Sequence, residues 1–485
     1  MAEVTTSPAD AGAPPRGASA AAWSRADTVA LAAVTLVAAV LRGWRLSVPG
    51  RIVFDEGYYA PDACVLWRGQ EACGVDGIYS RVHPYLAKWL IGAGIEIFGY
   101  RPFGWRVAAV AFGVLGVALL FVLARRLLRS TAAATLAAGL LAIDGLHFVQ
   151  SRVAMLDVFV ATFSLATILF VVVDRDRERR PGERLRDRPW LLAAGAAAGA
   201  AAASKWSGFP FLVVALVLVV AWDARAARDR GDGAGWLRTV RREAWVLVAA
   251  FAIVPAAVYV AAAIPGVDGR VLAVPWDYDA WPRAFLRWQQ RILTFGVALE
   301  GEYPYASPGW SWPLLKRPVV YALETEGGVY RHILALGNPA IWWASIPAVV
   351  ACAVWWVRRR GPAEAVVVAG VAAGYLWWIP ATVSRPFSFI FYITPALPFM
   401  CLALAVAARR LWTRRVGRGV VAAGVAAAIA SFAFFLPILS FHPLSADAWT
   451  ARLWFTDCRP EALEGDPPVP QTRETTPPPE GWCWI

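Results

Sequence analysis

Charged side chains are scarce in this chain of 485 residues. Asp, Glu, Lys and Arg together make up 17% of it, whereas soluble domains carry about a quarter. Hydrophobic residues make up 58%, and the mean hydropathy is +0.49. This balance excludes a soluble globular protein and indicates a polytopic integral membrane protein.

The signatures of two common kinds of site are also missing. There is no GxxxxGK[ST] phosphate-binding loop and no convincing dinucleotide fingerprint, so the sequence predicts no nucleotide site. Histidine occurs four times, at positions 83, 147, 332 and 442, without close ligand spacing. The sequence therefore predicts no metal centre.

The chain is basic, with a formal net charge of +12, but its arginines argue against a nucleic-acid-binding face. They lie in short blocks between apolar runs, as the positive-inside rule places them in membrane proteins. Nucleic acids are therefore not expected among its partners.

Eleven apolar segments approach the length needed to cross a membrane, about 20 residues. No internal repeat relates them. The short pair at 190–203 and 209–222 is interpreted as two spans with a turn at 204–208, because one kinked helix would put the arginine-rich loops beside it on opposite faces. The segments are Ala26–Leu46, Phe103–Ala124, Thr131–Val149, Val153–Val173, Trp190–Ala203, Phe209–Trp222, Ala244–Ile264, Pro339–Val357, Ala363–Val383, Phe387–Ala408 and Gly419–Leu439.

The arginines also set the orientation of these segments. The loops 124–130, 174–189, 223–242, 358–360 and 409–418 contain three, seven, six, three and five arginines. All five loops lie on one side of the membrane if the N-terminus is cytoplasmic. The positive-inside rule makes that side the cytoplasm.

This orientation divides the chain into three parts. Residues 1–25, rich in Ala, Pro, Ser and Gly, are predicted to be a disordered cytoplasmic tail. Residues 26–439 form a transmembrane unit with two long outer loops, 47–102 and 265–338. Residues 440–485 form an exterior C-terminal tail.

Each outer loop contains an amphipathic, aromatic-rich run. These runs are Pro84–Tyr100 in the first loop and Trp281–Phe295 in the second. We expect both to be helices that lie in the plane of the membrane interface.

Four of the six cysteines fall in the predicted exterior segments. Cys64 and Cys73 lie in the first outer loop, and Cys458 and Cys483 lie in the tail. An oxidising compartment favours disulfides, and four cysteines permit three pairings. Cys64 with Cys73 and Cys458 with Cys483 is the local choice.

The first outer loop carries the best candidate for acid–base chemistry. Asp55 and Glu56 follow a short apolar run at the predicted membrane surface, and Tyr58 and Tyr59 come directly after Gly57. A carboxylate shielded by aromatic rings can act as a general base on a hydroxyl. Adjacent acids are also common where an exposed loop begins, so spacing alone leaves both interpretations open.

Cations from three distant parts of the chain are predicted to lie at the membrane depth of Asp55. Arg106 stands at the outer start of the second span, Lys205 at the break 204–208, and Arg385 at the outer side of the tenth span. Each has an alternative role as an anchor among lipid headgroups. Together they suit transfer of a group from a lipid phosphate, because the departing phosphate needs its charge stabilised.

The segment 144–157, DGLHFVQSRVAMLD, places several polar side chains in an apolar neighbourhood. Arg152 and Asp157 are five residues apart, about 140° around a helix. They do not share one helix face, so we expect each to meet a partner on another helix.

Seven strings, in order along the chain, resemble the polyprenyl- or dolichyl-phosphate-mannose-dependent protein O-mannosyltransferases, which are glycosyltransferases of the GT-C type. The strings are FDEGYY at 54–59, HPYLAK at 83–88, DGLHFVQSRVAMLD at 144–157, SKWSG at 204–208, SPGWSWPLLKRPVVY at 307–321, GNPAIWW at 337–343 and RPFSFIFYITPALPF at 385–399. The ordered set is more specific than any one string, and it covers most of the chain.

The resemblance implies an all-α polytopic GT-C fold with about eleven transmembrane helices and interfacial helices in the outer loops. Two departures are visible. The segment 265–338 is too short for the lectin-like domain of eukaryotic members, which indicates a bacterial type. The string HPYLAK has Tyr85 and Ala87 where Pro and Gly are expected.

The activity that the resemblance implies is transfer of mannose from polyprenyl-phosphate-mannose, with inversion, to Ser or Thr hydroxyls of exported polypeptides. Asp55 would deprotonate the acceptor hydroxyl, and Glu56 would orient the sugar or the acceptor. Arg106 would bind the donor phosphate, with Lys205 and Arg385 as further contacts.

His83, Arg152 and Asp157 would support this site. The lipid-linked mannose phosphate is the donor substrate, no other cofactor is assigned, and a role for a divalent metal is left open. The partners implied are that donor, membrane lipids, and secreted or membrane polypeptides, together with the export machinery. The location implied is the plasma (inner) membrane, with the active site on the exterior face.

Two other functions would also fit the helices. A related glycosyltransferase that moves aminoarabinose or another sugar onto a lipid or glycan would share Asp55 and the cations, but the strings SPGWSWP and GNPAIWW favour a protein acceptor. A transporter predicts ionisable residues near mid-bilayer and paired halves. Here the ionisable residues gather at one face.

Overall fold

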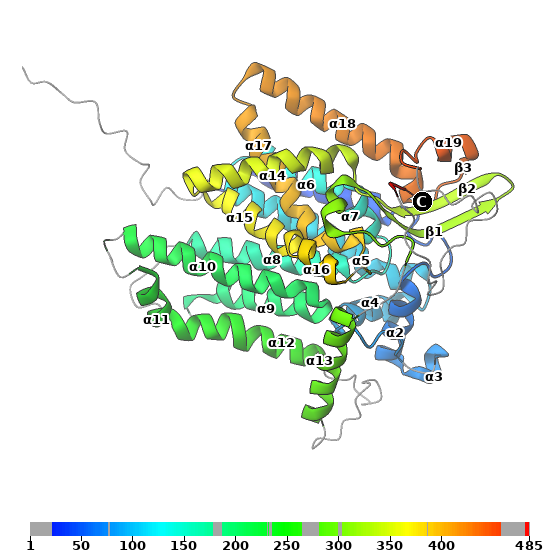
Figure 1. Cartoon of the computed structure of the whole chain (residues 1–485), viewed down its shortest axis with the longest axis horizontal. Coiled ribbons are helices and arrows are strands. Elements are labelled where there is room, and N and C mark those ends of the chain that lie inside the picture. Colours follow the sequence, from blue (N-terminus) through cyan, green and yellow to red (C-terminus); the bar gives the residue numbers. More distant parts are fainter. Residues whose placement is uncertain are drawn as a thin grey trace, which may run out of the picture.

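The computed structural model describes residues 22–75, 78–177, 187–229, 231, 235–263, 281–298, 303–385, 387–456 and 481–484. In these ranges the chain forms a bundle of long helices, with short helices and a small sheet gathered at one end (Figure 1). The predicted tail 1–25 lies almost wholly outside the described residues, as does Cys458.

All eleven predicted apolar segments are helical in the structure. Within the described ranges, nine are long and apolar enough to cross a membrane, and α6 (Thr131–Ala142) and α9 (Pro189–Ser204) are shorter apolar helices. The nine are α1 (Arg25–Gly43), α5 (Pro102–Leu128), α8 (Asp157–Arg175), α10 (Phe209–Asp229) with the turn before it, α11 (Gly235–Val248) continuing into α12 (Val254–Ala263), α14 (Pro339–Arg359), α15 (Pro362–Val371) continuing into α16 (Trp378–Ser384), α17 (Leu397–Leu411) with the turn before it, and α18 (Arg415–Leu439).

One predicted segment is divided where a polar side chain intervenes. The segment 131–149 becomes α6 and a short helix, α7 (Gly145–Gln150). Asp144 separates them, because its carboxylate accepts a hydrogen bond from the His147 backbone N–H at 2.9 Å and so begins a new helix. Hydropathy alone does not reveal this break.

The turn between α9 and α10 is imposed by the string SKWSG. Lys205 is extended, and residues 206–208 form a short 3-10 turn. Gly208 packs against the backbone of α9, where an added Cβ would lie 2.5 Å from the carbonyl carbon of Ala201. The chain therefore reverses here, and α9 and α10 are two helices, as the arginine pattern predicts.

Buried ion pairs hold the other end of the bundle. Arg188, just before α9, donates to Asp174 of α8 at 2.5 Å and to Asp223 of α10 at 3.2 Å. Arg125 of α5 bonds Asp27 of α1 at 2.6 Å. Charges at these depths are tolerated because each has a partner.

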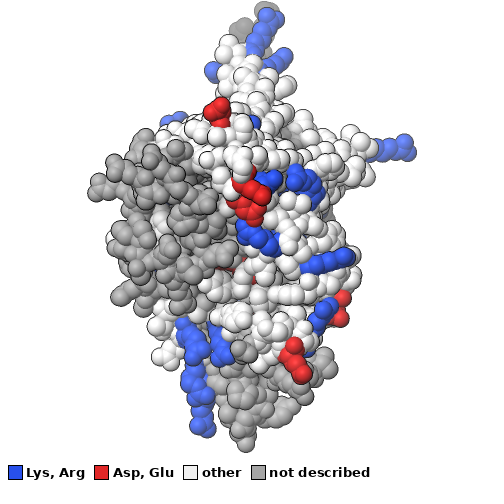
Figure 2. All heavy atoms as spheres, turned by 90° about the vertical axis from the view of Figure 1, so that its right-hand side faces the viewer, with Lys and Arg blue, Asp and Glu red and all other residues white. Residues whose placement is uncertain are grey.

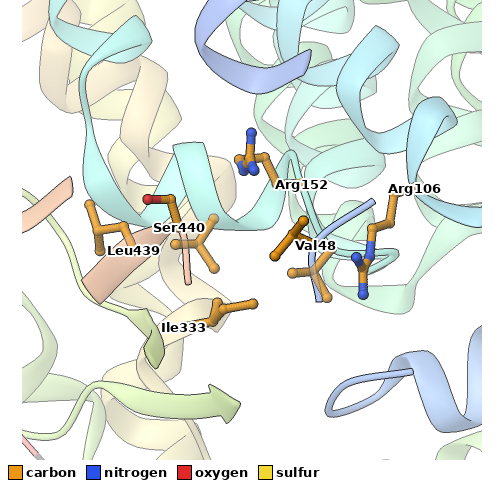
Figure 3. A pocket seen from close by; sticks show the side chains of 8 residues that line it. Val48, Arg106, Arg152, Ile333, Leu439 and Ser440 are labelled. Atoms are coloured by element: carbon orange, nitrogen blue, oxygen red, sulfur yellow. The ribbon is translucent and has the colours of Figure 1, made fainter. Parts of the chain in front are cut away.

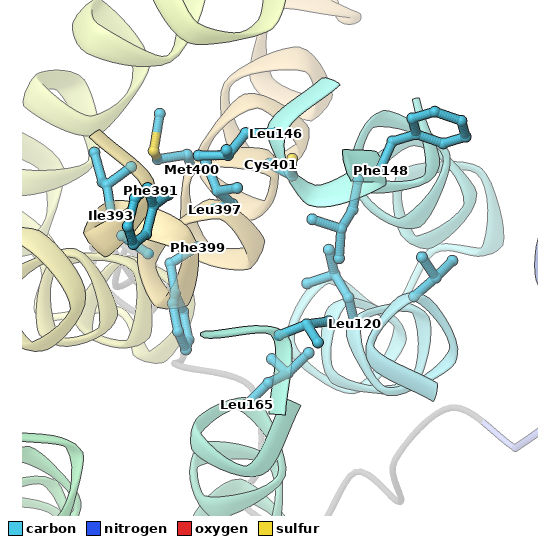
Figure 4. Close-up of a cluster of buried hydrophobic side chains, with 14 of the residues drawn as sticks. Leu120, Leu146, Phe148, Leu165, Phe391, Ile393, Leu397, Phe399, Met400 and Cys401 are labelled. Atoms are coloured by element: carbon cyan, nitrogen blue, oxygen red, sulfur yellow. The ribbon is translucent and has the colours of Figure 1, made fainter. Parts of the chain in front are cut away.

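The hydrophobic core lies between α5, α7, α8 and α17. Figure 4 shows its side chains interlocking from these helices, and the labelled ones are buried. In their most apolar stretches, 83% of the residues of α8 and 89% of those of the segment Ile390–Leu411 are buried. The corresponding shares are 22% for α1 and 17% for α18. The former are central, and the latter present most of their surface to lipid.

Four helices decorate the end of the bundle that carries Asp55. They are α2 (Glu56–Arg68), α3 (Gln70–Cys73), α4 (Leu86–Phe98) and α13 (Trp281–Ala298). Two of them, α4 and α13, are the amphipathic runs predicted from the sequence. A disulfide joins Cys64 of α2 to Cys73 of α3, which is the local pairing considered above. Cys483 is also disulfide-bonded, while its expected partner Cys458 is not among the described residues.

A three-stranded antiparallel sheet, which the sequence analysis does not predict, completes this end. It consists of β1 (Val319–Glu326), β2 (Val329–Ala335) and β3 (Leu444–Ser445), in the order β1-β2-β3, followed by α19 (Ala446–Thr450). Its hairpin pairs Val319 with Ala335 and Glu326 with Val329. The sheet thus joins the second outer loop to the C-terminal tail and brings β1 beside the first outer loop.

Candidate active site

Asp55 lies directly before α2, at a constrained point of the backbone. Phe54 adopts the left-handed conformation, with φ at 46°, which is unfavourable for a residue with a side chain. The Phe54 ring stacks on Tyr321 of β1, with centroids 4.4 Å apart, and this contact helps to hold the turn. Asp55 Oδ2 accepts a hydrogen bond from the Tyr59 hydroxyl at 3.3 Å.

The carboxylate of Asp55 interacts with charges from other helices. Lys205 and Asp157 are both close enough to act on it electrostatically. Burial raises the pKa of Asp55 to about 6; Lys205 opposes this rise and Asp157 adds to it. Figure 2 looks onto this end of the molecule and shows acidic atoms within a recess near its centre. A carboxylate with such a pKa can accept a proton near neutral pH.

Lys205 is fixed at the break between α9 and α10. Its Nζ donates to both carboxylate oxygens of Asp157, at 2.9 and 3.0 Å. It also lies 4.4 Å from the ring centroid of Tyr392 and 5.6 Å from that of Phe391. An aromatic face attracts a cation, so the ammonium is held from two sides. Asp157 thus meets a partner on another helix, as expected.

Glu56, next to Asp55, has quite different surroundings. It is fully buried, and its carboxylate accepts hydrogen bonds from the backbone N–H groups of Val53 and Ala154, each at 3.1 Å. Arg106 Nε and Nη2 donate to its two oxygens at 2.8 and 2.9 Å. The two adjacent acids therefore differ, because Glu56 is neutralised by a bidentate ion pair and Asp55 has no ion pair with any residue that the structure describes.

Arg106 has no free donor for another anion. Besides Glu56, it donates to the carbonyls of Leu46, Pro49 and Arg51, at 3.1, 2.9 and 2.9 Å. These bonds use all five N–H groups of the guanidinium. A donor phosphate could reach Arg106 only by displacing one of them.

Arg385 is the opposite case. Among the described residues it has no carboxylate partner, and its buried Nε makes no hydrogen bond. Its guanidinium carbon lies 5.9 Å from the ring centroid of Tyr392, the ring that Lys205 also approaches. Arg385 and Lys205 therefore flank one tyrosine, and Arg385 has donors to offer a ligand.

His83 adds a neutral polar group to the same region. Its ring centroid lies 6.2 Å from that of Tyr59. Burial, and then the charges of Lys205, Lys88 and Arg385, hold the pKa of His83 well below its usual range. A neutral imidazole offers one donor and one acceptor, so His83 can bind either phosphate or sugar oxygens.

A buried ion pair holds the loop that carries His83. Lys88 of α4 bonds Asp62 of α2 at 2.9 Å, and both side chains are fully buried. Asp62 also accepts from the backbone N–H groups of Tyr79 and Ser80, at 2.6 and 3.0 Å. The segment before His83 is therefore fastened to α2, the helix that directly follows Asp55.

The structure adds two residues that the sequence analysis missed, Tyr321 and Gln150. The Tyr321 hydroxyl accepts a hydrogen bond from Gln150 Nε2 at 2.9 Å. Burial and the charges of Asp157 and Asp55 hold the pKa of Tyr321 well above its usual range, so its proton remains available to donate. Both residues lie in strings noted in the sequence, Gln150 in 144–157 and Tyr321 at the end of 307–321, but nothing in the sequence placed β1 beside Phe54.

Arg152 does not join this group. It donates to the carbonyls of Leu41, Arg42 and Trp44 at the end of α1, at 3.1, 2.7 and 2.6 Å. A small pocket lies beside it, with Val48, Ile333 and Ser440 in its lining (Figure 3). The arginines of this pocket, Arg106 and Arg152, are both engaged with backbone carbonyls.

The arrangement suits a displacement at a carbon atom from which a phosphate group leaves. Asp55 has no ion-pair partner among the described residues. Lys205 is close enough to act on it electrostatically, and His83, near Tyr59, lies close to both Lys205 and Arg385. Among the described residues, no three His, Cys, Asp or Glu side chains are placed to hold a metal ion. The geometry assembles in one place residues from the first outer loop, α8, the α9–α10 turn and the segment before α17.

Two family models match the chain. Residues 95–268 match the family described as dolichyl-phosphate-mannose-protein mannosyltransferase. Residues 282–458 match the C-terminal four-TMM region of protein-O-mannosyltransferase. The two matches together span most of the described bundle.

Curated relatives are similar along nearly the whole chain. The polyprenol-phosphate-mannose–protein mannosyltransferase of Mycolicibacterium smegmatis is 32% identical over 488 residues, which is 88% of this chain and 92% of the relative. The protein of the same name from Mycobacterium tuberculosis is 33% identical over 481 residues, 88% of this chain and 91% of the relative.

Solved structures share the fold at low identity. The Saccharomyces cerevisiae Pmt1–Pmt2 complex bound to the sugar donor matches with a TM-score of 0.70 and 15% identity, covering 89% of this chain and 92% of that one. ArnT from Cupriavidus metallidurans bound to undecaprenyl phosphate matches with a TM-score of 0.53 and 20% identity, covering 84% of this chain and 64% of that one.

Proposed function

Since the chain belongs to the polyprenol-phosphate-mannose–protein mannosyltransferase family, and is therefore a membrane glycosyltransferase that transfers mannose to proteins, we propose that Asp55 is the general base of this transfer. The donor is polyprenyl-phosphate-mannose, and the acceptor is a Ser or Thr hydroxyl of an exported polypeptide. The observation that carries the proposal is the Asp55 carboxylate, which has no ion-pair partner among the described residues, a pKa of about 6, and the cation Lys205 close enough to act on it.

The reaction is a single displacement that inverts the anomeric carbon. The acceptor oxygen attacks that carbon while its proton passes to Asp55. The bond between the anomeric carbon and the phosphate oxygen breaks, and its electron pair leaves with the lipid phosphate. A base with a pKa near the working pH suits this proton transfer, because it is unprotonated before the step and able to hold the proton after it.

The departing phosphate is stabilised by Lys205 and Arg385. Both cations lie within 6 Å of the Tyr392 ring, and Arg385 has donors that no described residue uses. Preorganised positive charge lowers the barrier most where negative charge develops. The neutral imidazole of His83 supplies a further hydrogen bond to the phosphate or to the sugar.

Glu56 and Arg106 have a positioning role in this proposal, which replaces the phosphate contact expected for Arg106 from the sequence. Their ion pair, with its bonds to the backbone on both sides, fixes the turn that carries Asp55. Asp157 acts through Lys205, and Arg152 acts through the end of α1.

We assign the reaction to the exterior face of the plasma membrane, with the N-terminus in the cytoplasm. The support is the arginine content of the loops opposite the Asp55 end, which the positive-inside rule places in the cytoplasm. Acceptor polypeptides would then meet the site as they leave the export machinery.

The test is mannose transfer from a lipid-linked donor to a Thr-rich peptide by membranes that contain the full-length protein. Asp55→Asn keeps the size of the side chain but removes its basicity, so the rate should fall by about 10²- to 10⁴-fold, the usual contribution of a general base. Asp447→Asn is the matched control, because Asp447 is exposed on α19 at the same end of the molecule. Undiminished transfer by Asp55→Asn would refute the assignment of the base.

A further inference from the structure

Helix α13 has three distinct faces. Trp288 and Ile292 are buried in a small cluster with Val65, Leu66 and Tyr85 of the first outer loop. Trp288 Nε1 also donates to the carbonyl of Arg81 at 2.9 Å, which fixes the rotation of the helix. The remaining two faces are exposed and differ from each other in character.

One exposed face is a row of arginines. Arg283, Arg287 and Arg291 follow at intervals of four residues, so they lie along one stripe of the helix. All three are exposed, and none makes an ion pair with another described residue. Figure 2 shows basic side chains projecting from the lower part of this end of the molecule, the level at which Figure 1 draws α13.

The other exposed face carries leucines. Leu286 and Leu293 are 65% and 52% exposed, although they belong to a helix that buries other apolar side chains. They lie about 60° to 80° from the start of the arginine stripe, on the side away from Arg291. Leucines beside arginines, with a third face bound to protein, form the pattern of a helix at a lipid–water boundary.

The direction of α13 agrees with this pattern. In Figure 1 it runs across the direction of α12 and of the other spanning helices, at the end of the bundle that carries Asp55. A helix in this direction lies parallel to the membrane surface, with its arginines at headgroup depth and its leucines towards the acyl chains.

The end of α13 reaches the candidate active site. Phe295 lies 6.2 Å from the ring centroid of His83 and 6.0 Å from the guanidinium carbon of Arg385. Whatever fixes the arginine row therefore also fixes the position of Phe295 against these two side chains.

We propose that the row Arg283, Arg287 and Arg291 is a docking surface for the phosphates of anionic phospholipids in the adjacent leaflet. The guanidinium groups bind the headgroup phosphates, which their planar donors fit, and Leu286 and Leu293 enter the upper acyl region. The bound lipids hold α13 against the bilayer and so keep Phe295 in place beside His83 and Arg385.

The experiment measures lipid contact and does not depend on the proposed reaction. A fluorophore is attached to a cysteine at Gln290, an exposed position between Arg287 and Arg291. Of the described cysteines, Cys352 and Cys401 are buried and Cys64, Cys73 and Cys483 are disulfide-bonded, so the new thiol reacts selectively. The full-length protein is placed in nanodiscs of phosphatidylcholine and phosphatidylglycerol, with a spin label near the top of the acyl chain of one lipid or the other.

Phosphatidylglycerol should quench the fluorophore more strongly than phosphatidylcholine at equal mole fraction. Replacing one arginine by glutamine should lower this preference by up to about fivefold, the equivalent of ~1 kcal/mol for a basic residue at an anionic surface. In the triple variant Arg283→Gln/Arg287→Gln/Arg291→Gln, the two labelled lipids should quench the fluorophore equally. The matched triple lysine variant keeps the charge and should retain most of the preference, which shows that the substituted helix is still folded.

Two results would overturn the proposal. The first is equal quenching by both lipids in the protein with its natural arginines. The second is a preference that persists in the triple glutamine variant. Equal quenching together with a shift of the fluorescence on adding an acidic peptide would assign the row to polypeptides instead of lipids.

Discussion

At the scale of single residues, Asp55 and Glu56 show how neighbouring carboxylates acquire different chemistry. Glu56 is buried against Arg106 and two backbone N–H groups. Among the described residues, Asp55 accepts a side-chain hydrogen bond only from the Tyr59 hydroxyl, and it lies near a lysine that is already paired. Glu56 is thus held in an ion pair, whereas burial raises the proton affinity of Asp55.

The pH dependence of transfer should reflect Asp55. Because the base must be unprotonated, and the pKa of Asp55 is about 6, kcat/KM should fall tenfold per pH unit below about pH 6. The charge of Lys205 lowers this pKa, so Lys205→Met should move the acidic limb to higher pH, while Lys205→Arg should leave it nearly unchanged. Rate profiles from pH 4 to 8 measure the acidic limb of each variant. An acidic limb that Lys205→Met does not move would contradict the assignment to Asp55.

Arg106 and Arg385 should respond to substitution in opposite ways. Arg106→Met leaves Glu56 buried without its partner, which costs about 3–5 kcal/mol and should lower the melting temperature. Arg385→Gln removes a cation without a carboxylate partner, so it should raise KM for the lipid donor by about 10- to 100-fold, with little change in melting temperature. Thermal unfolding and donor titrations distinguish the two. A large stability loss in Arg385→Gln would place it with the framework residues.

Sequence motifs mark only part of the candidate site, whereas other residues come near it only through the fold. Asp55 and Lys205 lie in the strings FDEGYY and SKWSG. A carboxylate suggests a base, and an ammonium group suggests a contact for a phosphate. The sequence suggested that Arg106 contacts the donor phosphate. Nothing in the sequence indicates that the carbonyls of the loop before Asp55 occupy the N–H groups of Arg106. Tyr321 reaches the site only through β1.

At the scale of the elements, the outer helices and the sheet position the site while the spanning helices support it. The disulfide and the Asp62–Lys88 pair fasten α2, α3 and α4 together, and β1 supplies the ring that stacks on Phe54. Of the outer helices, α2 and α3 were not predicted, whereas α4 and α13 were predictable from their amphipathic, aromatic-rich sequences. The strands were not, since they are short, and β3 lies more than a hundred residues after its partner β2.

The Asp62–Lys88 pair should control the order of the loop that carries His83. Lys88→Met leaves Asp62 buried without its cation, so the segment before His83 should loosen and transfer should slow. Limited proteolysis should show faster cleavage between α3 and α4, with the spanning bundle intact. Lys316→Met is the control, because the ammonium of Lys316 has no carboxylate partner among the described residues and lies 5.7 and 6.0 Å from the ring centroids of Trp310 and Trp482. Equal protease resistance in both variants would show that the pair is dispensable for the loop.

At the scale of the whole molecule, buried ion pairs occur at both ends of the bundle. Arg188 pairs with Asp174 at one end, and Lys88 pairs with Asp62 at the end that carries the candidate site. Hydropathy and arginine counts were enough to predict the helical segments, because a lipid environment demands long apolar helices. They do not determine which helices are central. Both α8 and α1 are apolar, but 83% of the residues in the apolar stretch of α8 are buried and only 22% of those in α1.

The orientation can be tested on intact cells. A cysteine is introduced at Asp447, on α19, or at Arg359, the last residue of α14. The two cysteines should react differently with a membrane-impermeant maleimide. The cysteine at 447 should be labelled from outside, and the one at 359 only after the cells are opened. The reverse pattern would place Asp55 on the cytoplasmic side and contradict an exterior reaction.

The unequal surroundings of Asp55 and Glu56 have a consequence for inhibitors. A compound with two amines spaced for adjacent carboxylates would find only one of them available, because the second is already occupied by Arg106. A monocationic compound, with its amine against Asp55 and an anionic group towards Arg385, would match the site better. Selectivity would then come from the distance between those two groups, which this fold sets with chain segments more than three hundred residues apart.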